Sequence, residues 1–295
     1  MKHYPVLLEP ALEYLAIRED GLYVDATAGL GGHSGEIARR ARSGRVVASD
    51  RDLESLEKAR QNTAEWQDRI TFLQSRFSDL PAKLAEAGFG PSDGLLADLG
   101  VSRYQLTNPE RGFSLMAEGF PDMRMNRSEG ETAADILNFT AEKALADLIY
   151  QLGEERRAKR ISRAIVRARP IRSTLHLAKV IEEAAPRTGR IHPATQTFMA
   201  LRMAVNEEPA ELDALMTAIP KLVRPGGRAV IITFMSLEDR KVKQAFQALA
   251  REGRARILTK HVVRPGEQET AENPPSRSAK LRAIELHNRA GCYRL

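Results

Sequence analysis

The strongest constraint on the fold is an alternation of short apolar runs with helix-like segments over roughly the first hundred residues. Four runs suit β-strands, at residues 22–26, 45–49, 70–73 and 94–97, and helical segments separate them at residues 33–42, 53–61 and 81–87. Strands that alternate with helices pair in parallel, and the helices cover both faces of the sheet. With right-handed crossovers, this predicts an α/β fold with a doubly wound, Rossmann-like sheet.

The alternation stops after Asp98 and returns near residue 212. The intervening sequence contains helical periods only, at residues 133–137, 141–152, 156–169, 174–184 and 194–205. Further on we expect a helix at residues 212–222, a strand at 228–234, a helix capped by Ser236, and an antiparallel hairpin of residues 256–263 and 280–287. The pattern predicts an α/β domain over residues 1–106 and 207–295, interrupted by an all-helical insertion over residues 107–206.

Composition narrows the class of protein. Hydrophobic residues make up 42% of the 295 residues, as in a globular protein, and no apolar run approaches the ~20 residues that span a bilayer. The first eight residues are too short and polar for a signal peptide. The single cysteine, Cys292, excludes an internal disulfide, and the six histidines show no metal-ligand spacing. We therefore expect a cytoplasmic protein with no membrane segment and no metal.

A glycine-rich turn, DATAGLGGHS at residues 25–34, joins the first expected strand to the first expected helix. Glycine lets a backbone turn sharply and approach a ligand, although a plain strand-to-helix turn has the same composition. Asp25 distinguishes the alternatives, because a carboxylate there opposes a pyrophosphate and suits the ammonium group of a methionine moiety. We therefore interpret the loop, with Gly29, Gly31 and Gly32, as a site for S-adenosylmethionine rather than for a dinucleotide.

Three residues at the ends of later strands complete the expected donor site. Asp50 ends the second strand about 20 residues after Gly29, where an acid can accept both ribose hydroxyls. Phe77 follows the third strand and either packs against adenine or belongs to the core. Asp98 ends the fourth strand, at the carboxyl edge where such sheets bind ligands. Their order along the chain indicates an S-adenosylmethionine-dependent methyltransferase.

A row of arginines marks the helical insertion. Arg156, Arg160, Arg163 and Arg167 recur at spacings of four, three and four, which places them on one face of a helix. The formal net charge of +6 is small enough for an ordinary solvated surface. A row of like charges repels itself unless an anion neutralises it, however, and phosphate is the obvious candidate. We interpret the row as a surface that binds RNA.

Many short sequence strings resemble those of the bacterial 16S rRNA (cytosine-N4)-methyltransferases. They are HYPVLL at residues 3–8, DATAGLGGHS at 25–34, DRD at 50–52, DLGVS at 98–102 with Gln105, ERGF at 110–113, DMRM at 122–125, GEER at 153–156, HPAT at 192–195, SLEDR at 236–240 and SRSAKLR at 276–282. The resemblance implies a class I methyltransferase domain with a helical insertion that recognises RNA, and it is compatible with a homodimer. It also implies a cofactor site made by Gly31, Gly32, His33, Asp50, Phe77, Asp98 and Gln105.

The chain departs from the family pattern at several positions. Met235 stands where a histidine is usual, and a thioether cannot replace an imidazole as donor or acceptor. The other departures are Arg103 for Ser, Gln196 for Arg, Met199 for Gln, Phe120 and Pro121 for a single Leu, Pro209 for Leu, and Pro275 for Arg. Most lie outside the expected cofactor residues, so they bear on the acceptor rather than on the methyl donor.

The resemblance implies transfer of a methyl group to the N4 amine of a cytosine in the decoding region of 16S rRNA, within the small ribosomal subunit. Asp98 and the carbonyls that follow it are the natural acceptors for that amine, with help from Ser102, although Asp98 can equally serve only the cofactor. Methylation at C5 requires a cysteine nucleophile, and Cys292 lies in none of the motifs. Two alternatives stay open: a methyltransferase with another acceptor, and a non-catalytic RNA-binding assembly factor.

Two smaller clusters complete the sequence-based picture. Asp122, Arg124 and Arg127 form either a lip beside the substrate or a surface ion cluster. Glu238 and Asp239 are most simply helix-cap and salt-bridge residues.

Overall fold

A computed structural model describes residues 5–187, 189 and 191–287, so His3 and Cys292 lie outside the described residues. The chain divides into two compact units, one formed by Met1–Gly100 with Ala210–Leu295 and the other by Val101–Pro209. In the described part of the chain, no helix is both long enough and apolar enough to cross a membrane.

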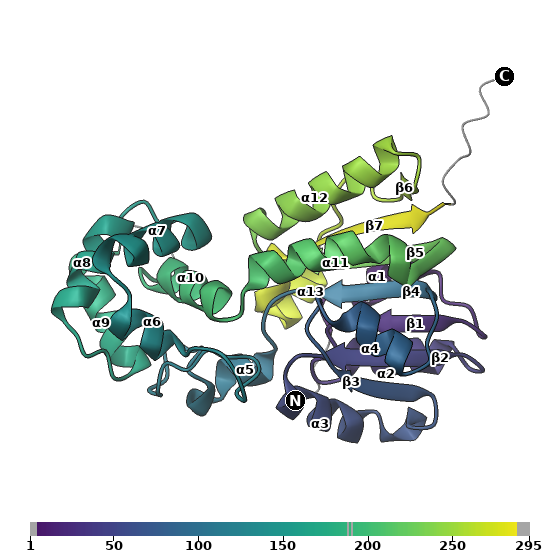
Figure 1. Cartoon of the computed structure of the whole chain (residues 1–295), viewed down its shortest axis with the longest axis horizontal. Coiled ribbons are helices and arrows are strands. Elements are labelled where there is room, and N and C mark those ends of the chain that lie inside the picture. The colour runs from purple at the N-terminus through teal and green to yellow at the C-terminus, as the bar shows by residue number, and fades with distance from the viewer. Residues whose placement is uncertain (1–4, 188, 190, 288–295) are drawn as a thin grey trace. The chain divides into compact units, whose positions relative to one another are not determined.

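The first unit contains a seven-stranded sheet in the order β3-β2-β1-β4-β5-β7-β6 (Figure 1). Its strands are β1 (Leu22–Asp25), β2 (Arg45–Asp50), β3 (Ile70–Gln74), β4 (Ser92–Asp98), β5 (Val223–Thr233), β6 (Ala255–Ile257) and β7 (Lys280–Leu286). The first five strands run parallel, and β7 lies antiparallel between β5 and β6. This sheet confirms the predicted α/β fold with a doubly wound, Rossmann-like sheet.

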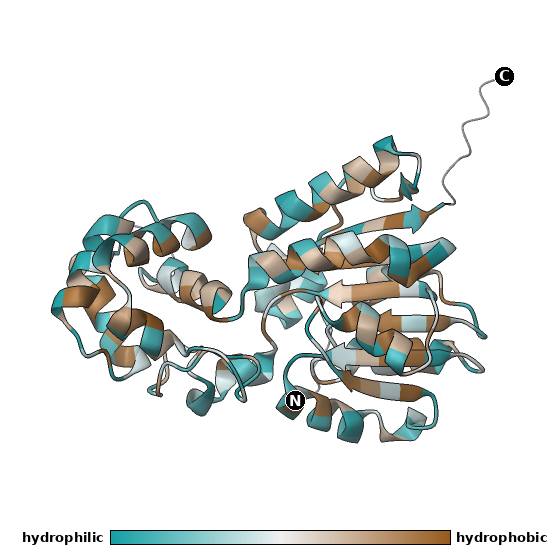
Figure 2. Ribbon diagram, viewed as in Figure 1, coloured by the Kyte–Doolittle hydropathy of each residue, from teal (hydrophilic) through white to brown (hydrophobic). Residues whose placement is uncertain are grey.

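Helices cover both faces of the sheet because successive strand residues point to opposite sides. Leu95 of β4 packs in a core with α4 (Leu80–Glu86), α11 (Glu208–Leu222) and α12 (Ser236–Arg251). Its neighbour Leu96 packs in a second core with α1 (Leu8–Leu15), α2 (Gly32–Arg40) and α3 (Leu53–Asn62). The buried part of the central strand β4 is accordingly apolar, as the hydropathy colouring in Figure 2 shows.

In the second unit, the regular secondary structure of the described residues is all helical, and irregular loops join the helices. It contains α5 (Arg103–Thr107), α6 (Ala133–Phe139), α7 (Glu142–Gly153), α8 (Ala158–Arg167), α9 (Thr174–Ala184) and α10 (Thr195–Val205). These helices enclose their own core, in which Leu145, Ile161 and Leu201 are completely buried. A hydrophobic core of this kind is what an independently folding unit requires.

Several sequence-based boundaries were wrong. β5 begins at Val223 rather than at residue 228, and α11 begins at Glu208 rather than at residue 212. The helix expected at residues 156–169 is α8 and begins only at Ala158, because the buried Glu155 carboxylate accepts the Arg157 N–H and holds a turn there. Arg156 therefore precedes the helix. The N-cap of α12 is Met235 rather than Ser236. The expected strand at residues 256–263 shrinks to β6, with one isolated bridge between Val263 and Leu281.

Candidate active site

The glycine loop between β1 and α2 requires glycine on steric grounds. Gly29 and Gly31 have φ angles of 50° and 87°, a region that side chains rarely adopt. A Cβ on Gly31 would lie 2.9 Å from the Thr63 methyl carbon, and one on Gly32 would lie 2.5 Å from Cγ of Pro5. The loop therefore needs glycine both for its backbone conformation and for its close packing against Thr63 and Pro5.

Asp25 holds this loop to α2. The residue is completely buried, with one carboxylate oxygen accepting the Thr27 N–H at 3.1 Å and the other accepting the Ser34 hydroxyl at 2.6 Å. Burial raises the pKa of Asp25 to about 6, and these hydrogen bonds oppose the rise. Both oxygens are thus engaged within the protein, and Asp25 fixes the conformation of the loop.

Asp50 ties the end of β2 to the same loop. Its carboxylate oxygens accept the N–H of Gly29 at 2.8 Å and the N–H of Asp52 at 2.9 Å. Burial raises the pKa of Asp50 to about 6 as well. Each carboxylate oxygen can accept a second hydrogen bond, so Asp50 retains capacity for a pair of hydroxyl groups.

Asp98 differs from the other two acids in its hydrogen bonding. Its main-chain N–H donates to the Thr27 hydroxyl at 2.6 Å, which fixes the C-terminal end of β4 beside the glycine loop. Oδ1 is buried without a hydrogen-bond partner among the described residues, while the side chain as a whole is 22% exposed. Burial, followed by the charges of Asp25, Glu238 and Glu269, raises the pKa of Asp98 well above its ordinary value. A cation or a hydrogen-bond donor would satisfy this carboxylate.

His33 lies next to Asp98 and is only 5% exposed. Its Nε2 is 3.1 Å from the Val6 carbonyl, and its Nδ1 is 3.9 Å from Oδ2 of Asp98. A carbonyl oxygen can only accept, so Nε2 carries the proton of that bond. The ring is therefore oriented with Nδ1 toward the carboxylate.

Phe77 combines the two predicted roles only in part. It is partly buried and packs against the core that contains Leu95, so one portion of the ring serves the core. Contact between the remaining portion and adenine stays a prediction.

Ser102 and Gln105 belong to the second unit and cap α5. The Ser102 hydroxyl accepts the Gln105 N–H at 3.2 Å, and the Gln105 side-chain oxygen accepts the Ser102 N–H at 2.8 Å. This reciprocal pair is a capping box. Both side chains thus have a structural role, and their predicted contacts with cofactor or acceptor remain predictions.

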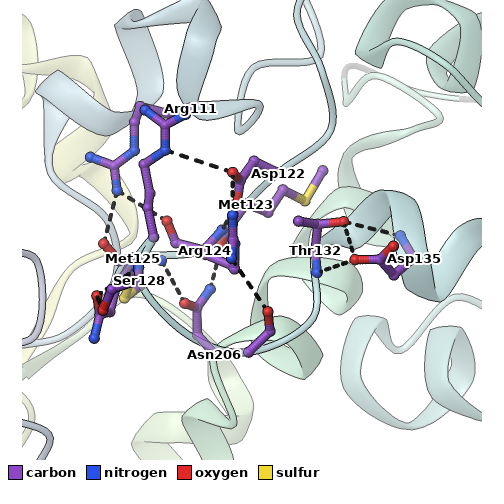
Figure 3. A network of polar contacts seen from close by, with 12 residues as sticks. Arg111, Asp122, Met123, Arg124, Met125, Ser128, Thr132, Asp135 and Asn206 are labelled. Carbon is purple, nitrogen blue, oxygen red and sulfur yellow. Dashed lines mark hydrogen bonds and ion pairs between the residues drawn. The ribbon is translucent and has the colours of Figure 1, made fainter.

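Asp122 anchors a polar network in the second unit (Figure 3). It is 3% exposed and pairs with Arg124 at 2.7 Å and Arg127 at 3.7 Å. The completely buried Arg111 donates to the carbonyls of Arg124 and Met125, and Asn206 bonds both the N–H of Met125 and the carbonyl of Met123. These bonds hold Met123 at a φ of 59°. The cluster therefore rigidifies a loop, as a structural ion cluster would.

The arginine row is largely a property of α8. Arg160, Arg163 and Arg167 are exposed on this helix, while Ile161 and Ile165 are buried on the opposite side. Arg156 is exposed in the preceding turn. Among the nearest charges, Glu142 lies 3.4 Å from Arg163, in a pair that is largely solvated and hence weak.

Two residues of the site, Thr27 and Ser34, escaped the sequence interpretation, whereas Glu238 has the helix-cap role expected of it. Thr27 and Ser34 bond Asp98 and Asp25, as described above, and Glu238 accepts the backbone N–H groups of Phe234 and Met235. The spacing of Asp25 and Thr27 is typical of an Asx turn, so the hydrogen bond from the Thr27 N–H to Asp25 could have been predicted. The contact between Thr27 and Asp98 spans 71 residues and leaves no local signal.

Metal ligation finds no support in the described residues, which contain no group of three histidine, cysteine or acidic side chains suited to a metal ion. The donor set around the glycine loop consists of backbone groups and isolated carboxylates. Such a set suits an organic ligand with cationic and hydroxyl groups.

Comparisons with known proteins agree with this geometry. The model of the MraW methylase family matches residues 1–287. A protein of Solibacter usitatus, "Ribosomal RNA small subunit methyltransferase H", is 62% identical over 284 residues, which cover 96% of this chain and 99% of that protein. A protein of the same name from Acidobacterium capsulatum is 48% identical and is covered to 98%. The expected methyltransferase fold and methyl donor, S-adenosylmethionine, are confirmed, and the chain belongs to the MraW methylase family.

Proposed function

We propose that this protein transfers a methyl group from S-adenosylmethionine to the exocyclic N4 amine of a cytosine in the decoding region, the P site, of 16S rRNA. Family membership and relatives named as small-subunit rRNA methyltransferases support an rRNA acceptor. The observation that carries the chemistry is the buried Oδ1 of Asp98, an acceptor without a partner at the end of β4.

The donor would be held by the glycine loop and the acids around it. The backbone of Gly29, Gly31 and Gly32 permits close approach, and the ribose hydroxyls would donate to Asp50. When bound, S-adenosylmethionine supplies an electrophilic methyl group on a positively charged sulfur. We assign further contacts to Asp25, His33, Phe77, Asp98 and Gln105 from the sequence pattern.

Asp98 would prepare the acceptor amine. The lone pair of that amine is delocalised into the cytosine ring, so a hydrogen bond from the amine to a carboxylate favours attack. Carbonyls of Leu99 and Gly100, with Ser102, would complete the set of acceptors. As the new N–C bond forms and the S–C bond breaks, the amine must lose a proton, and the raised pKa of Asp98 suits a group that receives it.

Met235, the most conspicuous departure from the family pattern, is compatible with this assignment. Its backbone N–H donates to the Glu238 carboxylate at 3.1 Å, a bond that any residue except proline can make. The contact therefore does not depend on the usual imidazole.

The helical unit would bind the RNA. A cytosine in a duplex is inaccessible, so the base must be flipped out or presented in a loop while its backbone is held elsewhere. The exposed arginines of α8, with Arg156 before it, offer such a backbone contact.

Mass spectrometry of 16S rRNA tests the proposal. Small subunits from cells that lack this protein should contain no N4-methylated cytosine in the decoding region, and the intact gene should restore it while an Asp98→Asn gene should not. An unchanged signal in the deletion strain would overturn the acceptor assignment. The alternative of a non-catalytic assembly factor is tested by calorimetry with S-adenosylmethionine in the presence of small subunits. Such a factor would bind the subunits but not the methyl donor.

A further inference from the structure

Phe139 is the most exposed large hydrophobic side chain in the part of the chain that the structure describes. It is the last residue of α6, and it is 83% exposed. A single exposed phenylalanine is common on protein surfaces and needs no explanation by itself. The surroundings of Phe139 set it apart.

The backbone on both sides of Phe139 is fixed. Asn138 donates to the Ile171 carbonyl at 3.1 Å and accepts the Ile171 N–H at 2.8 Å. The Arg169 guanidinium donates to the carbonyls of Leu137, at 2.7 Å, and Thr140. Four hydrogen bonds thus clamp the corner between α6 and α7 to the segment that follows α8. The ring therefore stands on a rigid support, with only its own torsions to order on binding.

Three exposed arginines belong to the segments that contact this corner. The Arg163 guanidinium reaches Glu142, three residues beyond Phe139, at 3.4 Å. Arg167 lies one turn further along α8, and Arg172 directly follows Ile171, the residue clamped to Asn138. All three arginines are exposed. Glu142 faces Arg163 in a solvated pair, so the corner keeps a positive excess.

We propose that Phe139 is a stacking platform for an unpaired RNA base, and that Arg163, Arg167 and Arg172 hold phosphates of the same strand. Single-stranded RNA is bound by aromatic rings that lie within positively charged surfaces, because bases stack on the rings and phosphates meet the cations. A protein partner would favour a larger apolar patch than one ring among cations. This inference rests on the proposed rRNA substrate and adds a contact to nucleotides outside the methylated base.

Binding of a 12-nucleotide single-stranded RNA, measured by fluorescence anisotropy over a range of salt concentrations, tests the platform. Phe139→Ala should weaken binding about 5- to 150-fold without changing the salt dependence, because stacking releases no counterions. Arg163→Gln with Arg167→Gln should instead lower the slope of log affinity against log salt by about 1.4. Ile191→Ala is the matched control, because Ile191 is also a large exposed hydrophobic residue of the second unit, at 67% exposure. Its neighbour His192 pairs with Glu182, near the C-terminal end of α9.

A second variant reports on stacking directly. The chain has one tryptophan, Trp66, in the other unit, so the wild-type protein supplies the blank for Phe139→Trp. We expect Phe139→Trp to retain binding and its added emission to be quenched by RNA. An oligonucleotide series with single abasic positions should contain one member that removes the quenching.

Three results would overturn the inference. The first is an unchanged RNA affinity of Phe139→Ala, and the second is emission of Phe139→Trp that RNA does not quench. The third is a Phe139→Ala variant that binds assembled small subunits more weakly but binds protein-free RNA normally, which would identify a protein contact. The N4-methylcytidine assay is read separately. If wild-type protein methylates rRNA while Phe139→Ala binds RNA normally, only the platform fails.

Discussion

The charged residues to which we assign function lie in opposite environments in the two units. In the first, Asp25, Asp50 and Asp98 are withdrawn from solvent at the ends of β1, β2 and β4, and burial raises the pKa of each. In the second unit, the arginines of α8 are exposed to solvent. Burying an ionised carboxylate costs free energy unless a cation or a hydrogen-bond donor contacts it, and such a carboxylate interacts with groups only a few ångströms away. Exposed arginines cost little and act over about a Debye length. This contrast is what the proposed function requires, with a small cationic ligand in the first unit and an extended anion on the second.

The sharpest test of this contrast is Asp98→Asn. The amide keeps the shape of the side chain but lacks the charge, and we expect methyl transfer to small subunits to fall at least about 100-fold. Asp93→Asn is the matched control, because Asp93 lies near the start of the same strand and pairs with Arg18 and Arg224. Transfer by Asp98→Asn within twofold of wild type would remove the carboxylate from the chemistry.

Arg111→Met tests whether the second unit depends on its own buried polar network. The change leaves the carbonyls of Arg124 and Met125 without their donor, and we expect a loss of about 3 kcal/mol in the free energy of unfolding of that unit. Hydrogen exchange of α6–α10 should rise, while Trp66 fluorescence should report an unchanged first unit. Arg127→Met is the control, since Arg127 is half exposed and should contribute less than about 1 kcal/mol. Equal loss of protection in both units would contradict separate stabilisation.

Buried acids should also make the first unit sensitive to pH. Asp25 and Asp50 have folded pKa values of about 6, against 3.8 ordinarily, so the folded state retains protons that the unfolded state has released. Their contribution to stability is therefore complete below about pH 4 and is lost as the pH rises through 6. Asp25→Asn should flatten this decline by up to about 3 kcal/mol. Urea unfolding followed by Trp66 at several pH values measures it, and identical pH profiles would refute the burial argument.

Replacing Arg160, Arg163 and Arg167 by glutamine should have the smallest effect, about a tenfold loss of RNA affinity at low salt. The salt slope should decrease by about 2, one phosphate contact for each arginine. Arg39, Arg40 and Arg42 in the first unit, replaced together, match the charge change. Equal slopes for the two triple variants would show that net charge, rather than the face of α8, governs RNA binding.

The strands were predictable from sequence because buried parallel strands are apolar along their length, and β1 to β4 lie within about two residues of the predicted ranges. Helix ends were less predictable. The start of α8 depends on the turn that Glu155 holds, and Met235 rather than Ser236 precedes α12, where Glu238 reaches back to two backbone N–H groups. The acids of the site were found because each ends a strand. Thr27, which joins Asp98 to the glycine loop, becomes visible only once the sheet places the ends of β1 and β4 side by side.

The insertion of the helical unit between β4 and β5 also dictates an order of synthesis. Ser92 pairs with Val223, so β4 leaves the ribosome about 130 residues before its partner. The helical unit, with a complete core of its own, is available to fold during that interval, whereas the sheet waits with one edge of β4 uncovered. Co-translational assembly should therefore complete the helical unit first and the sheet of the other unit last.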